Sequence, residues 1–370
     1  MKAHRTLSDT ERRAWIRLAR APNVGPTTFS TLINRYGSAT QALADLPRLM
    51  RRGGSEPRPL PSDEDAAREI EALTKLGGRF IASVENEFPR GLAVLEAPPP
   101  IISVLGNPSL LAREMVAIVG ARNASALGRK LAATLAQDLS ASGLVVVSGM
   151  ARGIDAAAHE GALGAGTCAV VAGGIDYIYP PENKVLYERL REEAVIVSEM
   201  SVGLVPQARH FPRRNRIISG LARGVIVVEA AEGSGSLITA NYALEQSREV
   251  FAIPGSPLDP RAKGANRLIR EGATLTETAE DVLAVLRPII GRDFCEPEGR
   301  TFEFGSVSLD DAEAGRLRAI LEEALGPAPV EVDELVRLSG ATAAVVLTVL
   351  LELELAGRVA RHPGNRVSWR

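Results

Sequence analysis

Six short apolar runs between residues 116 and 253 constrain the fold of this chain more than any other feature of its sequence. They are Val116–Val119, Leu144–Val147, Cys168–Ala172, Ala194–Val197, Val225–Val228 and Val250–Ile253. Each run is nearly continuous in apolar, mostly β-branched or small residues and does not alternate with polar ones. Strands with this pattern are buried on both faces, as strands are in a parallel sheet.

Segments with helical patterns and polar faces separate these runs. The expected helices are Leu127–Ser142, Ala156–Leu163, Glu182–Glu193, Asn215–Leu221 and Leu237–Gln246. Alternation of strands with helices predicts right-handed crossovers between parallel strands. The expected fold class is therefore α/β, with a Rossmann-like, doubly wound and mostly parallel sheet.

Two smaller modules flank the expected sheet. Before it, Ser8 to Glu11 offers a helix N-cap, and the turn at Pro22–Thr28 joins two helical segments, which is typical of a helix–hairpin–helix unit. The Gly and Pro residues of Pro47–Pro61 predict a loop that ends this unit. After it, expected helices at Asp310–Leu325, Glu331–Ser339 and Thr342–Leu355, with a hairpin turning at Pro363–Asn365, predict a winged helix.

The expected domains follow from these patterns. They are a helical SAM-like or helix–hairpin–helix unit at 1–85, a Rossmann-like domain at 86–290, a linker at 291–306 and a winged-helix domain at 307–370.

Charge is sorted along the chain although the formal total is only −2. Residues 1–85 carry a net charge of +4, residues 86–290 carry −1 and residues 291–370 carry −5. The third helix of the expected winged helix contains Glu352 and Glu354 but no Arg or Lys, the wrong sign for a helix that reads the major groove. We therefore expect the winged helix to contact protein. The turn at Val24–Pro26 either presents backbone N–H groups to duplex phosphate or serves packing alone.

The sequence offers little for catalysis or for a cofactor. The loop Gly120–Arg129 matches neither the dinucleotide fingerprint nor a P-loop, so no cofactor is expected. His159 has no identifiable nucleophile or carboxylate partner, which favours packing or a structural hydrogen bond. Cys168 and Cys295 are expected to be unpaired thiols outside any metal site. No run approaches the roughly 18 apolar residues of a membrane span, and a cytoplasmic location is expected.

The loops after the strands are where an open parallel sheet binds ligands. The first loop carries Arg122 beside a helix start at which Ser125 is a candidate cap, a generic cradle for phosphate. The loop Gly173–Lys184 adds Tyr177 and Tyr179, rings that either stack on bases or pack in the core. Further anion-accepting turns are expected at 148–155, around Gly149 and Arg152, and at 233–236, around Ser234, Gly235 and Ser236.

A run of arginines is the strongest cationic feature. Arg213, Arg214 and Arg216 surround Asn215, and no acidic residue lies between Met200 and Val228. A solvated helix face normally mixes both signs, so this run predicts phosphate contact. Anion-accepting turns, arginines and aromatic rings together favour a polyanion with bases to stack, which single-stranded nucleic acid satisfies.

The motif series resembles the DNA-processing protein A (DprA/Smf) family. The matching segments are 116–122, 147–155, 158–163, 179–183, 211–221, 234–240, 254–255 and 264–266. The resemblance spans roughly 88–286 and implies a non-catalytic homodimer that binds and protects incoming single-stranded DNA. It also implies loading of the RecA recombinase during natural transformation and homologous recombination. By motif, Arg122 matches the family's phosphate-contacting Arg, and Lys184 falls where a DNA-contacting Lys is expected.

Two other interpretations of the sequence remain open. A nucleotide or nucleotide-sugar hydrolase is the alternative on a related fold, although residues 232–236 do not reproduce the loop of such enzymes. The terminal modules alternatively act only as protein–protein adaptors. The candidate DNA-binding residues are Gly120, Arg122, Gly149, Arg152, Lys184, Arg213, Arg214, Asn215, Arg216, Ser234, Gly235 and Ser236, and no catalytic or metal-binding residue is expected.

Overall fold

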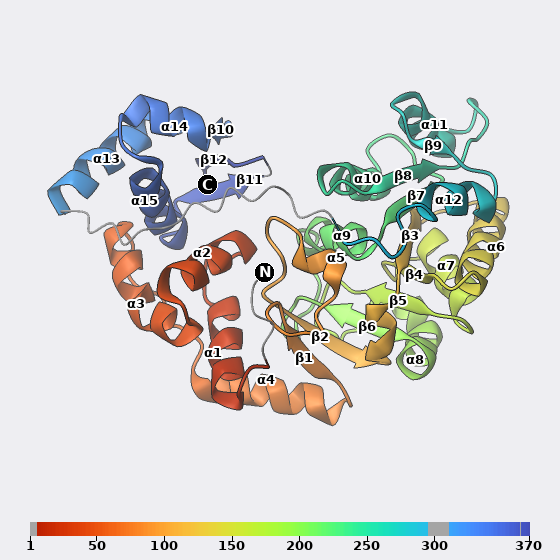
Figure 1. Ribbon diagram of the computed structural model, residues 1–370, viewed down its shortest axis with the longest axis horizontal. Helices are drawn as coiled ribbons and strands as arrows, with labels where there is room; N and C mark the ends of the chain where they lie inside the picture. The colour runs from red at the N-terminus through yellow and green to blue at the C-terminus, as the bar shows by residue number, and fades with distance from the viewer. Residues whose placement is uncertain (1–5, 295–310, 363) are drawn as a thin grey trace. The chain divides into compact units, whose positions relative to one another are not determined.

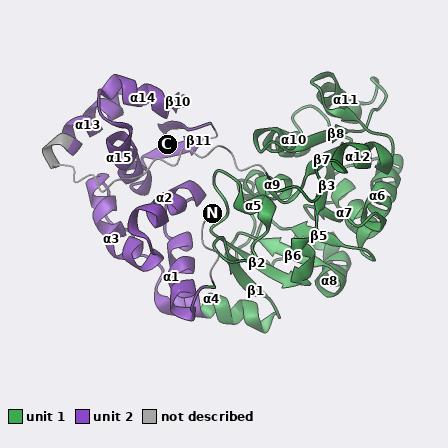
Figure 2. Ribbon diagram, viewed as in Figure 1, with its two compact units in different colours: residues 1–6, 68–297 green, residues 7–67, 298–370 purple. Residues whose placement is uncertain are grey.

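The chain forms two compact units, which are described separately (Figures 1 and 2). The computed structural model describes residues 6–294, 311–362 and 364–370, with no description of the side chains of 311–313. The first unit, here the sheet unit, comprises residues 68–297 with 1–6, and the second, here the terminal unit, comprises 7–67 and 298–370. None of the described helices is by itself long and apolar enough to span a membrane. The helices Val332–Ser339 and Ala343–Leu355, bent by 115°, reach that length and apolar composition only when taken together.

A nine-stranded sheet organises the sheet unit. The strands are β1 (Arg79–Ala82), β2 (Ile101–Gly106), β3 (Met115–Gly120), β4 (Val145–Ser148), β5 (Thr167–Val170), β6 (Val195–Ser198), β7 (Gly224–Val228), β8 (Glu249–Ala252) and β9 (Thr274–Leu275). Their spatial order is β1-β2-β6-β5-β4-β3-β7-β8-β9. Neighbours from β6 to β9 pair in parallel, and β2 runs antiparallel to both β1 and β6.

Helices cover both faces of this sheet. They are α5 (Arg90–Ala93), α6 (Ala126–Ala141), α7 (Ile154–Ala162), α8 (Lys184–Glu193), α9 (His210–Leu221), α10 (Gly235–Glu245), α11 (Lys263–Arg270) and α12 (Ala279–Leu286). Short 3₁₀ turns lie at η1 (Pro108–Ala112), η2 (Pro181–Asn183) and η3 (Pro260–Ala262).

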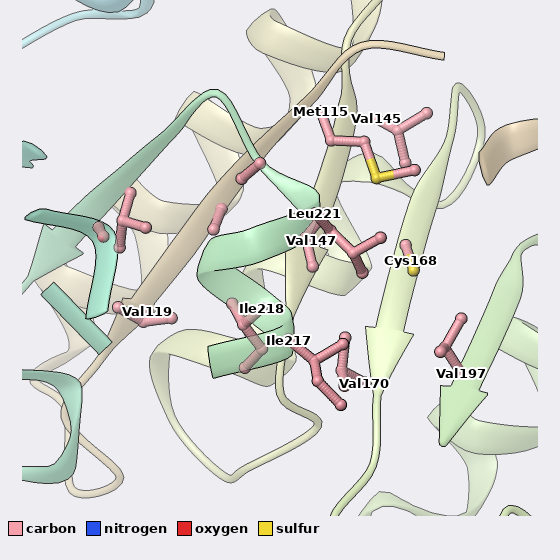
Figure 3. Packing of buried hydrophobic residues seen from close by; sticks show 14 of the residues in the cluster. Met115, Val119, Val145, Val147, Cys168, Val170, Val197, Ile217, Ile218 and Leu221 are labelled. Carbon is pink, nitrogen blue, oxygen red and sulfur yellow. The ribbon is translucent and has the colours of Figure 1, made fainter. Parts of the chain in front are cut away.

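The apolar runs are continuous because each strand contributes to two cores. In β3, Val116 and Ile118 join a cluster with residues of α6, α7 and α12. Met115 and Val119 belong to the opposite cluster, which contains Ile218 of α9 and residues of α10 (Figure 3). Alternate side chains of one strand thus meet different helices, so that both sets must be apolar. The predicted α/β fold class is confirmed.

The sheet unit begins earlier than the expected boundary at residue 86, because β1 precedes that residue and pairs with β2. At the other end, the guanidinium of Arg223 donates to a carboxylate oxygen of Glu114 at 2.7 Å and lies over the ring of Phe294, 3.5 Å from its centroid. These contacts hold the start of the expected linker against the sheet unit. The remainder of the linker, with Cys295, lies outside the described residues.

The terminal unit combines an N-terminal segment, residues 7–67, with a C-terminal segment, residues 298–370. Its elements are α1 (Asp9–Arg20), α2 (Pro26–Tyr36), α3 (Ala39–Arg52), α13 (Asp311–Ala324), β10 (Val330–Glu331), α14 (Val332–Ser339), α15 (Ala343–Leu355), β11 (Val359–His362) and β12 (Arg366–Trp369). A further helix, α4 (Asp63–Lys75), crosses the division between the units. The predicted capping box at Ser8 and Glu11 is present at the start of α1.

The loop expected from Pro47 is wrong for its first residues, because α3 continues through Pro47 to Arg52. Leu43, Leu46 and Leu49 are buried along this helix. Their burial offsets the roughly 3 kcal/mol that an internal proline costs. The expected hairpin turn at 363–365 includes Pro363, which lies outside the described residues.

The winged-helix segment packs against the N-terminal helices of the same chain. The carboxylate of Glu352 in α15 is fully buried and pairs with Arg52 at the end of α3 (3.2 Å) and Arg318 of α13 (3.1 Å). The Oε1 atom of Glu354 accepts a hydrogen bond from the hydroxyl of Thr28 in α2 at 2.7 Å. The acidic residues that made α15 unsuitable for reading DNA are therefore contacts between the two modules.

Candidate nucleic-acid interface

A cavity of about 520 Å³ lies beyond the carboxyl ends of β3 and β7. From β3 the chain builds one side of the sheet through β4, β5 and β6. It then returns to the other side of β3, where β7 lies. This reversal of strand order opens a crevice between neighbouring loops, which is the usual ligand site of a doubly wound sheet.

The cavity brings together seven of the predicted site residues. They are Gly120, Arg122, Arg214, Asn215, Ser234, Gly235 and Ser236. Gly149, Arg152, Lys184, Arg213 and Arg216 are not among the residues that line it. The lining residues come from the loops after β3, β4, β7 and β8 and from the start of α9.

Two of the predicted glycines are required by close packing. A Cβ atom on Gly149 would lie 2.0 Å from Nη1 of Arg214, and a Cβ atom on Gly120 would lie 1.9 Å from the carbonyl oxygen of Val228. Both distances are far shorter than any real Cβ contact. These glycines therefore permit the close approach of other groups, which is a structural role that the phosphate-binding interpretation did not include.

Arg214 forms part of the cavity wall but is buried. Its Nη1 atom donates hydrogen bonds to the carbonyl oxygens of Gly149 and Val170, at the ends of β4 and β5. Burial lowers the pKa of Arg214 to about 10, and Asp155 opposes that shift. The guanidinium is therefore charged at neutral pH and holds two strand ends together, rather than standing free in solvent.

Asp155 is the buried acid of the cavity. Its Oδ2 atom accepts hydrogen bonds from the backbone N–H groups of Gly149 and Ala151. Burial raises the pKa of Asp155, although Arg214 and the two backbone donors act in the opposite direction. Asp155 lies in the first turn of α7, whose N-cap is Gly153, and its carboxylate links this turn to the loop that precedes it.

Although no acidic residue lies between Met200 and Val228, the arginine run has an acidic partner. Glu199 lies just outside the acid-free stretch and pairs with Arg216 at 2.7 Å and with Arg213 at 3.2 Å. Burial raises the pKa of Glu199, but Arg216 and Arg213 together outweigh burial and the net pKa lies below its usual value. Arg216 also donates to the carbonyl oxygen of Ala97. Glu199 thus offsets one of the two positive charges of Arg213 and Arg216.

The phosphate cradle expected at the start of α6 is occupied by the chain itself. Glu229, which follows β7, accepts hydrogen bonds from the backbone N–H and the hydroxyl of Ser125. That hydroxyl in turn caps the helix by accepting from the N–H of Gly128 at 2.8 Å. A second anion at this helix start would meet the carboxylate of Glu229, which disfavours phosphate there.

The start of α10 offers the alternative cradle. Ser234 is its N-cap but makes no capping hydrogen bond with its side chain, and its hydroxyl instead lies 2.6 Å from that of Ser236. Residues 234–236 line the cavity. Backbone N–H groups and the positive end of the helix dipole are therefore directed at the cavity, an arrangement that favours an anion.

Three features of the cavity were absent from the site predicted from the sequence. The first is the carboxylate of Asp155. The second is the ring of Phe211, whose centroid lies 5.2 Å from the guanidinium of Arg122, and the third is the half-buried pair of Arg261 with Asp259. Arg261 follows β8, and the rule that ligands bind at carboxyl ends of strands would have found it. Phe211 precedes the arginine run, but nothing in the sequence placed it against Arg122.

The remaining residues singled out from the sequence do not line the cavity. Arg152 and Lys184 are exposed, and Arg152 lies 3.6 Å from Glu182. His159 is fully buried with Nδ1 2.7 Å from the hydroxyl of Thr167, which confirms its structural interpretation. Cys168 is a buried free thiol whose pKa burial raises to about 12. Among the described residues, no group of His, Cys, Asp and Glu side chains could hold a metal ion.

The fold defines a class of protein: a Rossmann-like domain joined to a helix–hairpin–helix module and a winged helix. Three family models describe its parts as "DNA recombination-mediator protein A" (79–287), "DprA-like N-terminal HHH domain" (9–72) and "DprA winged helix domain" (308–365). The chain belongs to the DNA-processing protein A (DprA/Smf) family.

Individual relatives agree with this assignment. "Protein Smf" of Synechocystis is 31% identical over 98% of this chain and 100% of its own length. The crystal structure of DNA processing protein A from Streptococcus pneumoniae superposes with a TM-score of 0.62 and 35% identity, covering 76% of this chain and 98% of that one. The structure of DNA processing protein A from Helicobacter pylori, a protein with a "unique single-stranded DNA binding mode", has a TM-score of 0.53 and 30% identity over 58% and 97% of the two chains.

Proposed function

We propose that the chain binds single-stranded DNA, without sequence preference, in the cavity beyond β3 and β7. The observation that carries the proposal is the lining of that cavity: Arg122 supplies charge, α10 directs its N-terminus inward and Phe211 offers a ring. Cations and helix dipoles bind phosphate, and exposed rings bind unpaired bases. Single-stranded DNA binding by the Helicobacter pylori relative supports the same ligand.

Within the family context, the bound strand is incoming DNA that the chain protects and transfers to RecA during natural transformation and homologous recombination. The chain works as a homodimer in the cytoplasm and catalyses no reaction on the DNA. The engagement of Asp155 supports the last point, because its carboxylate is held by two backbone N–H groups and faces a buried arginine.

Among the predicted arginines, Arg122 is assigned the phosphate contact, since it is exposed and lines the cavity. Arg213, Arg214 and Arg216 are assigned to holding the site together, because their guanidinium groups already bind Glu199 or strand-end carbonyls. This division changes which substitutions should weaken DNA binding directly.

The test measures the affinity of the full chain for a labelled oligothymidylate and for a duplex, by fluorescence anisotropy across a series of salt concentrations. We expect tighter binding of the single strand, a steep fall with salt and a clear loss of affinity in Arg122→Ala. Arg189→Ala is the matched control: it removes the same charge from α8, the helix that leads into the amino end of β6.

Equal affinity of Arg122→Ala and the wild type for oligothymidylate would overturn the site. Binding that is tighter for duplex at every salt concentration would overturn the ligand. Release of free base from AMP by the purified chain would instead support the nucleotide hydrolase considered above.

A further inference from the structure

An exposed aromatic ring that does not line the cavity contacts Phe211, the ring over which Arg122 lies. The centroids of Tyr179 and Phe211 are 5.5 Å apart with their rings tilted by 58°, and Arg122 lies over Phe211. Tyr179 is 44% exposed and is not among the cavity residues. We call Arg122, Phe211 and Tyr179 the stacking row.

The exposure of Tyr179 separates it from a tyrosine of the core. Tyr187, eight residues later, is buried and donates its hydroxyl hydrogen bond to the carbonyl oxygen of Ile175. Tyr177, in the same loop as Tyr179, is 38% exposed. Large exposed rings carry a free-energy cost in water that a stacked ligand removes, so that their position beside a binding cavity favours contact with bases.

The loop that carries Tyr179 is tied to the loop after β4. The side-chain amide of Asn183 donates to the carbonyl oxygens of Met150 and Ala151, at 2.8 and 3.3 Å. This link brings the segment that ends at Lys184 next to the segment that contains Arg152. The two cationic side chains therefore belong to two loops that are tied together, one of which carries Tyr179.

Both cations can reach a phosphate. Lys184 is exposed, and the pair between Arg152 and Glu182 is 3.6 Å long with both side chains about 60% exposed. A pair of this kind stabilises a fold little and is readily exchanged for another anion.

The order of the strands indicates in which direction along the sheet edge the stacking row extends from the cavity. The cavity lies over β3, β7 and β8, whereas Arg152 follows β4 and Tyr179 follows β5. From β8 to β5 the edge crosses four strand spacings, roughly 19 Å at about 4.8 Å each. The stacking row thus continues the cavity along the carboxyl edge of the sheet toward β5.

We propose that the bound strand leaves the cavity across Phe211 and stacks a base on Tyr179, with Lys184 and Arg152 facing the phosphate that follows. The inference rests on the proposed function, since it concerns the path of the same single strand. The inference assigns Tyr179 a contact with a base. This contact requires no particular sequence, because every base presents a π-face.

The test compares an oligothymidylate with an abasic oligonucleotide of equal length, which has the same phosphates but no bases to stack. Stacking on an aromatic side chain is worth about 1 to 3 kcal/mol per base, so Tyr179→Ala should weaken oligothymidylate binding about 5- to 150-fold. The same variant should bind the abasic strand within about twofold of the wild type, since its phosphate contacts persist.

Three further variants separate stacking from loop structure. Tyr179→Phe keeps the ring and should bind as the wild type, whereas Tyr179→Leu keeps apolar packing on Phe211 and should bind as Tyr179→Ala. Tyr242→Ala is the control, because Tyr242 lies in the last turn of α10, at the end remote from the cavity.

Equal loss for both oligonucleotides in Tyr179→Ala, or no loss for either, would overturn this inference. Full affinity in Tyr179→Leu would also overturn it, because packing alone would then suffice. If Arg122→Ala weakens binding while the Tyr179 variants do not, only the exit path is wrong. If Arg122→Ala binds the oligothymidylate normally, the proposed site itself is wrong.

Discussion

Replacing Arg214 by methionine tests whether this arginine holds the site together or contacts DNA. The guanidinium donates to the carbonyl oxygens of Gly149 and Val170, and it faces the buried carboxylate of Asp155. Methionine fills much of the same volume but leaves both carbonyls without this donor and Asp155 without its buried countercharge.

The size of the effect follows from these contacts. A hydrogen bond from a charged donor contributes about 1.5 to 3 kcal/mol. Because the guanidinium of Arg214 donates two such bonds, we expect Arg214→Met to lower the free energy of unfolding of the sheet unit by about 3 to 5 kcal/mol. With a urea slope of about 1 to 3 kcal/mol per M, the midpoint should fall by about 1 to 5 M.

The assay can assign the loss to one unit. Both tryptophans, Trp15 and Trp369, lie in the terminal unit, so their fluorescence follows that unit, whereas far-UV circular dichroism follows the whole chain. Arg214→Met should shift the dichroism transition and leave the tryptophan transition unchanged. The control is Arg213→Met, whose half-exposed side chain shares Glu199 with Arg216; its expected cost is below about 1 kcal/mol.

The structural role of Arg214 is refuted if Arg214→Met is as stable as Arg213→Met but loses oligothymidylate affinity to the same extent as Arg122→Ala. Arg214 would then act on the ligand, and its contacts with the strand ends would contribute little.

Two more predictions concern buried charge in each unit. Burial, with a smaller effect of Arg214, lowers the pKa of His159 to about 3, so acidification protonates this residue in the unfolded chain first. Through His159, the free energy of unfolding should therefore fall by about 2 kcal/mol between about pH 7 and about pH 5. Urea titrations at each pH measure this dependence, and His159→Asn should abolish it. In the terminal unit, Arg52→Glu sets a like charge against the buried Glu352 and should lower the tryptophan-fluorescence midpoint, whereas Arg52→Lys should retain it. An unchanged midpoint in Arg52→Glu would show that this pair does not join the two modules.

The parallel strands were predictable because burial on both faces leaves a local record in the sequence. Val116–Val119 is apolar at every position, since its side chains alternate between two cores. The antiparallel edge was not predicted. β1 has only four residues, and its pairing with β2 is a contact between segments about twenty residues apart. A short apolar run in isolation does not specify which edge of a sheet it joins.

The roles of the site residues depended on contacts that sequence spacing does not reveal. Arg122 lines the cavity because the loop after the first parallel strand lies at the carboxyl edge, and its contact with phosphate stays a prediction. The partners of Arg214 and Arg216 include Gly149, 65 positions away along the chain, and Glu199, 17 positions away. The pairing of Glu352 with Arg52 joins residues 300 positions apart, which no local pattern encodes.

Occupation of the cavity beyond β3 and β7 by single-stranded DNA is tested most directly by amide hydrogen exchange. The measurement compares the full chain with and without oligothymidylate and needs no substitution. We predict slower exchange at 120–125, 209–213 and 233–237 on binding, and no change in α15, which is buried within the terminal unit. Slower exchange confined to the terminal unit, with unchanged loops after β3 and β7, would contradict this site.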